Sequence, residues 1–136
     1  MAALLDTDIV IHLRDGDRWT RTAARALDPP LFLSAIGRIE LENGVWRDSE
    51  HRTARRAALD ALLPQFDVLP FAREEIEAYA AILASAGFSR RKTADRLSAA
   101  TALAHGLPVV TFNGRDFRDV PGLRLIEWVR PEGETG

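Results

Sequence analysis

The chain contains no cysteine and almost no lysine. The absence of cysteine from its 136 residues excludes disulfide bridges and cysteine-ligated zinc. Lys92 stands alone beside 17 arginines, so planar guanidinium groups, which bind phosphate in a bidentate manner, carry nearly all the positive charge. The formal net charge is −2, which provides no overall basic field to attract nucleic acid. A metal ion or a local arginine patch could supply that positive charge instead.

Long apolar runs and repeats are also missing. No run of about 18 apolar residues and no signal-type segment occurs in the sequence, so we expect a soluble, cytoplasmic protein with no membrane partner. With 46% apolar residues, the chain is able to bury a core of its own. We predict one domain over residues 1–130. The tail 131–136 lacks apolar side chains, and we expect it to be frayed.

Helical and strand patterns alternate along the chain. The run 109–111 is β-branched and too apolar on both sides for a half-exposed strand, and shorter apolar runs occur at 4–5, 31–33, 66–69 and 123–126. Between them, helical spacing of apolar residues predicts helices at 9–13, 19–27, 36–47, 51–63, 73–85 and from Asp95 to about 104. This alternation predicts an α/β fold with a parallel sheet. In the helix 73–85, the inward residues are expected to be Ile76, Tyr79, Ala80 and Leu83.

Carboxylates follow the predicted strands. Asp6 and Asp8 come directly after the first apolar run, although either could simply cap the next helix. Glu40 lies on a helix face whose other members are apolar or small, where an unpaired charge is costly to bury. Alternatively, Glu40 points outward or pairs with Arg38 or Arg47.

Two further acidic positions belong to the same predicted edge. Asp95 lies in the first turn of its helix, where the helix dipole alone would favour it, and Asp116 lies in the turn that also contains Asn113. Because ligand sites of open α/β sheets lie at the carboxyl ends of the strands, we expect these groups to meet the earlier carboxylates. Converging carboxylates repel one another unless a cation is present. Oxygen ligands select Mg²⁺ or Mn²⁺ over zinc.

Three segments carry a family resemblance: LLDTDIVI at 4–11, LSAIGRIEL at 33–41 and ADRLSAATALAHGLPVVTFNGRDF at 94–117. In this order and separation they resemble the PIN-domain family, and within it the VapC-type toxins of bacterial toxin–antitoxin pairs. The resemblance implies a three-layer fold in which helices flank a central sheet of five parallel strands. It also implies a Mg²⁺-dependent ribonuclease that cuts structured RNA such as tRNA, is silenced by a VapB-like antitoxin and forms a homodimer.

The resemblance also implies site residues. The catalytic and metal-binding acids are Asp6, Glu40, Asp95 and Asp116. Residues expected to support those carboxylates are Thr7, Asp8, Thr111 and Asn113, although strand-end capping explains the two threonines equally well. Many relatives have Asp at the position of Asn113 and Asn or Ser at that of Asp8, so the fourth acid is open between Asn113 and Asp116. The basic loop Arg90, Arg91 and Lys92 is expected to bind RNA phosphates, with a solvated loop as the alternative.

Other functions fit parts of the sequence. The pattern Asp-x-Asp-x-Val beginning at Asp6 is similar to the first motif of haloacid dehalogenase-like phosphatases, with Asp8 as acid/base and Lys92 as the required lysine. That alternative leaves Glu40 and Asp95 without a role. A third possibility is a non-catalytic PIN-like binding module.

An antitoxin-binding surface is expected on the early helices. Trp19, Val45 and Trp46 could form an apolar groove for an antitoxin helix, because such grooves bind the apolar face of a helix and Trp is a common anchor in interfaces. The alternative is that the two tryptophans complete the core or a homodimer contact.

Overall fold

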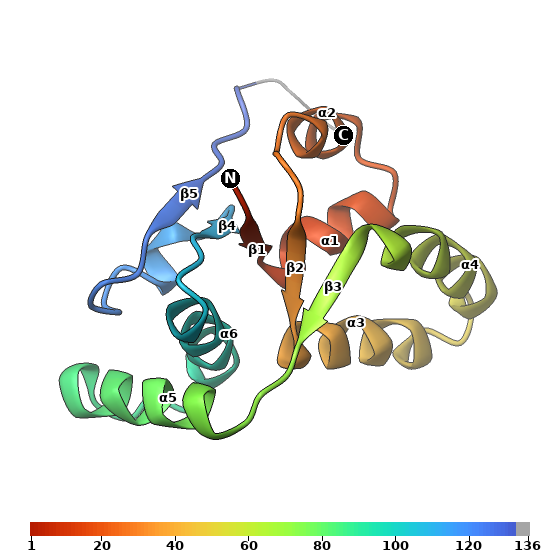
Figure 1. Cartoon of the computed structure of the whole chain (residues 1–136). Coiled ribbons are helices and arrows are strands. Elements are labelled where there is room, and N and C mark those ends of the chain that lie inside the picture. Colours follow the sequence, from red (N-terminus) through yellow and green to blue (C-terminus); the bar gives the residue numbers. More distant parts are fainter. Residues whose placement is uncertain (133–136) are drawn as a thin grey trace.

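A computed structural model describes residues 1–132 as a three-layer α/β fold built on one parallel sheet (Figure 1). The strands are β1 (Ala3–Leu5), β2 (Leu31–Ser34), β3 (Phe66–Leu69), β4 (Val109–Thr111) and β5 (Leu125–Glu127). Their order is β3-β2-β1-β4-β5, and every neighbouring pair is parallel. The predicted five-stranded parallel sheet is therefore confirmed. The predicted frayed tail falls mostly on residues 133–136, which lie outside the described residues.

Helices cover both faces of the sheet. They are α1 (Thr7–Arg14), α2 (Arg18–Arg25), α3 (Ala35–Arg47), α4 (Arg52–Leu62), α5 (Arg73–Ala86) and α6 (Thr93–Ala104), with short 3₁₀ turns η1 (Leu63–Gln65) and η2 (Gly114–Asp116). Leu5 and Val110 belong to a core cluster formed with α1, α3 and α4, whereas Leu4 and Val109 belong to a second cluster formed with α5 and α6. Because successive strand residues point to opposite faces, β1 and β4 each supply both clusters.

The strand order fixes where a site can form. From β1 the chain builds outward through β2 to β3, and then returns to the other side of β1 to place β4 and β5. The order therefore reverses between β1 and β4, which is the switch point at which open α/β sheets bind ligands beyond the carboxyl ends of the strands. Asp6 follows β1 and Asn113 follows β4, so both lie at this point.

Several predicted bounds differ from the structure by two residues; α2, for example, ends at Arg25 rather than Leu27, and α6 begins at Thr93 rather than Asp95. The first helix begins at Thr7 rather than Ile9, because the backbone of Asp6 already serves as the N-cap. The last strand begins at Leu125 rather than Leu123, since the preceding residues form the turn that leads into the sheet.

The predicted inward face of α5 is partly wrong. Ile76 is 55% exposed and Ala80 is also exposed, whereas Ile82 and Glu75 are buried at 2% and 4%. The Glu75 carboxylate accepts a hydrogen bond of 2.7 Å from the backbone N–H that precedes the helix, and its other oxygen lies 3.3 Å from Nε2 of His105 at the end of α6. These partners satisfy the buried carboxylate, so the helix turns Glu75 inward and Ile76 outward.

Candidate metal centre

A polar cavity of about 320 Å³ lies at the switch point. Its lining residues are Asp6, Thr7, Asp8, Ile11, Glu40, Asn43, Arg47, Asp95, Asn113 and Asp116. The structure thus brings together the four predicted acids from four separate parts of the chain, the end of β1, helix α3, the first turn of α6 and the turn η2. Thr111 is completely buried at the end of β4 and does not line the cavity itself. Its hydroxyl is hydrogen-bonded to two residues that do, Asp6 and Asn113.

Two threonine hydroxyls hold two of the acids. Oγ1 of Thr7 donates to Oε1 of Glu40 at 2.9 Å, and Oγ1 of Thr111 donates to Oδ2 of Asp6 at 2.8 Å. The backbone N–H of Asn113 donates to the same Thr111 hydroxyl at 2.9 Å. Asp6 makes no side-chain capping bond to α1, so its carboxylate is directed to Thr111 rather than to the helix. Each threonine therefore fixes one oxygen of a carboxylate without adding a charge.

Asp8 and Asn113 contact each other across the mouth of the cavity. Nδ2 of Asn113 donates to Oδ2 of Asp8 at 2.8 Å. The two positions at which this chain differs from many PIN relatives are therefore paired with each other. Asp116, three residues beyond Asn113, is the acid that lines the cavity from the same turn.

The electrostatics of the cavity favour a bound cation. Burial raises the pKa of Asp6 to about 7; the hydrogen bond from Thr111 opposes this, and the charges of Asp8 and Asp95 add to it. Burial likewise raises the pKa of Asp95 to about 6, and the charges of Asp116, Glu40 and Asp8 contribute in the same direction, while Arg91 opposes them. At neutral pH these carboxylates are costly to ionise together unless protons or a cation offset their repulsion.

The donor set fits a hydrated hard cation better than a closed cage. Within residues 1–132, no three histidine, cysteine, aspartate or glutamate side chains stand close enough together to hold a metal ion as they are arranged. The cavity nevertheless offers only oxygen donors from its five carboxylates. Mg²⁺ keeps several of its waters and takes one or two protein carboxylates directly. A hydrated divalent cation that prefers oxygen ligands therefore fits the chemistry of this cavity.

The predicted basic loop is divided in the structure. Arg90 is exposed, and Arg91, with 71% of its side chain exposed, places Nη1 3.5 Å from Oδ1 of Asp116. Lys92 is only 20% exposed because its Nζ binds Oδ2 of Asp119 at 3.1 Å. Arg90 and Arg91 thus remain accessible to a phosphate, whereas Lys92 is engaged within the fold. The residues that line the cavity do not include Lys92, so the phosphatase alternative lacks its lysine.

Arg47 and Asn43 line the cavity although the sequence analysis gave neither a role in the site. Asn43 lies three and Arg47 seven residues after Glu40 on α3, and side chains at this spacing share one helix face. Once Glu40 is placed in the site, the same spacing identifies both neighbours. Arg47 is the only cationic side chain among the residues that line this cavity.

The predicted groove of Trp19, Val45 and Trp46 is wrong as a single surface. Val45 is completely buried in the core because α3 packs that face against α1 and the sheet. Trp19 is partly buried and packs against Trp128, with ring centroids 5.9 Å apart. Trp46 is 59% exposed, with the guanidinium of Arg52 4.8 Å from its ring centroid. Only Trp46 remains available to a partner.

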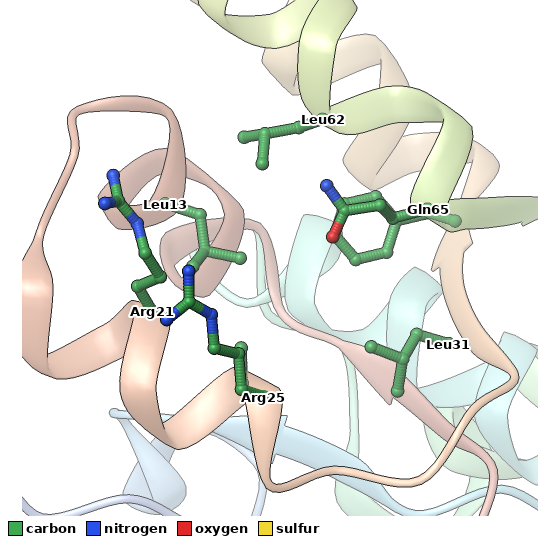
Figure 2. A pocket seen from close by; sticks show the side chains of 8 residues that line it. Leu13, Arg21, Arg25, Leu31, Leu62 and Gln65 are labelled. Carbon is green, nitrogen blue, oxygen red and sulfur yellow. The ribbon is translucent and has the colours of Figure 1, made fainter.

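A second cavity, of about 240 Å³, lies near Leu31 and Phe66, at the amino ends of β2 and β3. Figure 2 shows side chains that line it. Its lining residues are Leu13, Arg21, Ala24, Arg25, Leu31, Leu62, Gln65 and Phe66. It contains no carboxylate or imidazole, so it offers no charged ligand for a hard metal ion and no general base near neutral pH. The acidic cavity at the switch point is therefore the candidate catalytic site.

No helix within residues 1–132 is both long and apolar enough to cross a membrane.

Known proteins share the sequence pattern and the fold of this chain. The family model for the PIN domain matches residues 3–123. The chain is 30% identical to Ribonuclease VapC1 of Rickettsia felis, over 93% of this chain and 96% of that protein. Among solved structures, it superposes on VapBC2 from Rickettsia felis bound to a promoter DNA fragment with a TM-score of 0.82 at 23% identity, covering 95% of this chain and 100% of that one. It also matches VapBC-5 from Mycobacterium tuberculosis, a member of the VapBC family of toxin–antitoxin systems, with a TM-score of 0.70 at 26% identity, covering 93% and 98% of the two chains. The chain therefore belongs to the PIN-domain family, and its relatives within that family include VapC ribonucleases.

Proposed function

We propose that this chain is a Mg²⁺-dependent endoribonuclease toxin that hydrolyses phosphodiester bonds in structured RNA such as tRNA. The observation that carries the proposal is the convergence of Asp6, Glu40, Asp95 and Asp116 on one cavity at the switch point. The relative named Ribonuclease VapC1, with 30% identity over nearly the whole chain, supports RNA as the substrate class. Mn²⁺ is expected to substitute for Mg²⁺, because both are hard cations that accept oxygen ligands.

The residues of the cavity divide the chemical tasks. Asp6, Asp95 and Asp116 would hold the ion, which when bound supplies a Lewis acid that lowers the pKa of water and offsets charge on the phosphate. Glu40 accepts a hydrogen bond from Thr7 through Oε1, which leaves Oε2 to orient the attacking water and to accept its proton. Thr111 keeps Asp6 in one orientation during this step.

The partner is proposed to be a VapB-like antitoxin. VapBC-5 from Mycobacterium tuberculosis belongs to a toxin–antitoxin family, and the acidic cavity suits an antitoxin segment that carries Arg or Lys. Such a segment would compete with the metal ion and silence the enzyme without unfolding it. We also propose a homodimer, to which exposed apolar side chains such as Ile76 and Phe88 would contribute, and a cytoplasmic location, where RNA is accessible.

Cleavage of total bacterial tRNA in the presence of Mg²⁺ or Mn²⁺ tests the proposal. Asp6→Asn, Glu40→Gln and Asp95→Asn are each expected to lower the cleavage rate by about 100-fold or more, because Glu40→Gln removes the general base and the other two remove carboxylates that would hold the ion. Asp67→Asn, at an exposed position on β3, serves as the matched control. Melting curves of all variants establish that the fold survives.

Two outcomes would contradict this assignment. Near wild-type activity in two of the three cavity variants would mean that the chemistry takes place elsewhere. No metal-dependent cleavage of any RNA by the wild-type protein would favour a non-catalytic PIN-like binding module.

A further inference from the structure

Arg47 occupies a position in the cavity that the acids alone do not explain. It is the last residue of α3, seven positions after Glu40 and four after Asn43, and all three line the cavity. Five carboxylates line the same cavity. Arg47, whose side chain is exposed, is thus the one cationic residue among those that line the cavity.

The guanidinium of Arg47 is free, unlike those of other arginines near the site. Arg91 pairs with Asp116, Arg96 with Asp119 and Arg38 with Glu42. Within residues 1–132, Arg47 forms no ion pair and no side-chain hydrogen bond. One oxygen each of Asp6 and Glu40 is already bound by a threonine hydroxyl. Because Arg47 has no partner within the described residues, its N–H donors remain available to an anion that is not part of the fold.

Electrostatics indicate that this anion is a phosphate of the RNA other than the one that reacts. Carboxylates without a cation repel RNA, and a metal ion held by them offsets charge only at the phosphate that reacts. The neighbouring phosphates of the same strand still meet a negative surface. An arginine fork binds a phosphate through two parallel hydrogen bonds, which fixes its orientation as well as its position.

We propose that Arg47 binds the RNA phosphate next to the scissile one and thereby sets the register of the strand in the cavity. This assignment rests on the proposed ribonuclease function. Arg91 precedes α6 and lies 3.5 Å from Asp116. Arg47 is the last residue of α3. The two arginines would therefore contact the RNA from different elements of the fold. The contribution of Arg47 is to substrate binding, and the reacting groups remain the carboxylates.

Steady-state cleavage of total bacterial tRNA by Arg47→Ala, Arg47→Lys and wild-type protein tests the proposal. A charge-assisted hydrogen bond to phosphate corresponds to roughly a tenfold or greater change in affinity. Arg47→Ala is therefore expected to raise KM about tenfold with little change in kcat, and Arg47→Lys to recover part of the loss because it keeps the charge without the fork. Arg38→Ala is the matched control, because Arg38 lies on the same helix and pairs with Glu42 outside the cavity.

A binding measurement separates the failure of this proposal from the failure of the proposed function. The affinity for the same tRNA is measured against NaCl concentration in an Asp95→Asn background, with and without Arg47→Ala. Loss of one phosphate contact reduces the slope of log K against log salt by about 0.7 to 0.9, and this is the expected result.

Unchanged KM and an unchanged salt slope in the Arg47→Ala variant would overturn the assignment while the ribonuclease function stands. A fall in kcat alone, with unchanged binding, would also overturn it. Absence of cleavage by the wild-type protein would contradict the proposed function, and the salt slope in the Asp95→Asn background would still decide the role of Arg47.

Discussion

Replacing one buried carboxylate is expected to stabilise the metal-free protein at neutral pH. Asp6 is 8% exposed, and burial raises the pKa of its carboxyl from 3.8 to about 7, with the nearby charges of Asp8 and Asp95 acting in the same direction against the hydrogen bond from Thr111. Asp6→Asn removes the charge and keeps an oxygen that accepts the Thr111 hydroxyl. The substitution therefore tests the electrostatic cost of the cavity with little change in packing.

The sign and size of the effect follow from proton linkage. Between pH 3.8 and about 7 the unfolded chain has lost the Asp6 proton while the folded chain keeps it, so the free energy of unfolding falls as pH rises and levels off above this range. One pKa unit corresponds to about 1.4 kcal/mol, and the shift of about three units therefore amounts to at most about 4 kcal/mol. The Asp6→Asn variant does not pay this cost, because its amide does not ionise.

Urea denaturation from about pH 5 to about pH 8 in the presence of a chelator measures this difference. The stability gap between Asp6→Asn and wild type is expected to widen as pH rises to about 7 and to level off above it, while Asp67→Asn, exposed on β3, follows the wild type. Added Mg²⁺ is expected to narrow the gap, because an ion that binds only the folded wild-type cavity stabilises it by mass action. Parallel pH profiles for Asp6→Asn and wild type would refute the reasoning.

Two further predictions concern the fourth acid and the partner surface. Asp116→Ala is expected to slow cleavage more than Asn113→Ala at every Mg²⁺ concentration, because only a carboxylate adds a full charge to the ion site; the reverse order would assign the fourth position to Asn113. Trp46→Ala is expected to weaken capture of the antitoxin encoded by the neighbouring gene, because an exposed aromatic side chain is a common anchor of interfaces. Wild-type capture by the folded Trp46→Ala variant would remove this surface from the antitoxin interface.

The fold was accessible from the sequence because its central strands β1 and β4 are short and buried on both faces. The run Val109 to Thr111 is apolar without alternation, and all three residues are buried in β4. Such runs separated by helical spacing leave few arrangements other than a parallel sheet covered on both sides. The positions of Asp6 and Asn113 then follow, because Asp6 comes directly after β1 and Asn113 comes two residues after the end of β4.

The sequence could not predict the environments of side chains whose contacts are with residues distant along the chain. Glu75 is buried because His105 lies beside it at 3.3 Å, and a helical pattern read alone places a charged residue outside. Lys92 is withdrawn from the basic loop by Asp119, 27 residues later. Arg47 reads as an ordinary residue at a helix end until Glu40 is known to face the cavity. In each case a tertiary contact decides what a local pattern leaves open.

The contrast between the cavity and Asp119 indicates how the chain separates structural from reactive carboxylates. Hydrogen bonds from Lys92 and Arg96 hold the pKa of Asp119 below its usual range, so that acid is already matched by charge within the fold. In the cavity, Thr7 and Thr111 orient their carboxylates with neutral hydroxyls, which fix position but leave the negative charge uncompensated. An arginine in place of either threonine would satisfy the carboxylate equally well as a hydrogen-bond donor, and would remove the attraction for a cation. The choice of donor therefore keeps the free protein in a state that a metal ion, or a basic segment of an antitoxin, is able to stabilise.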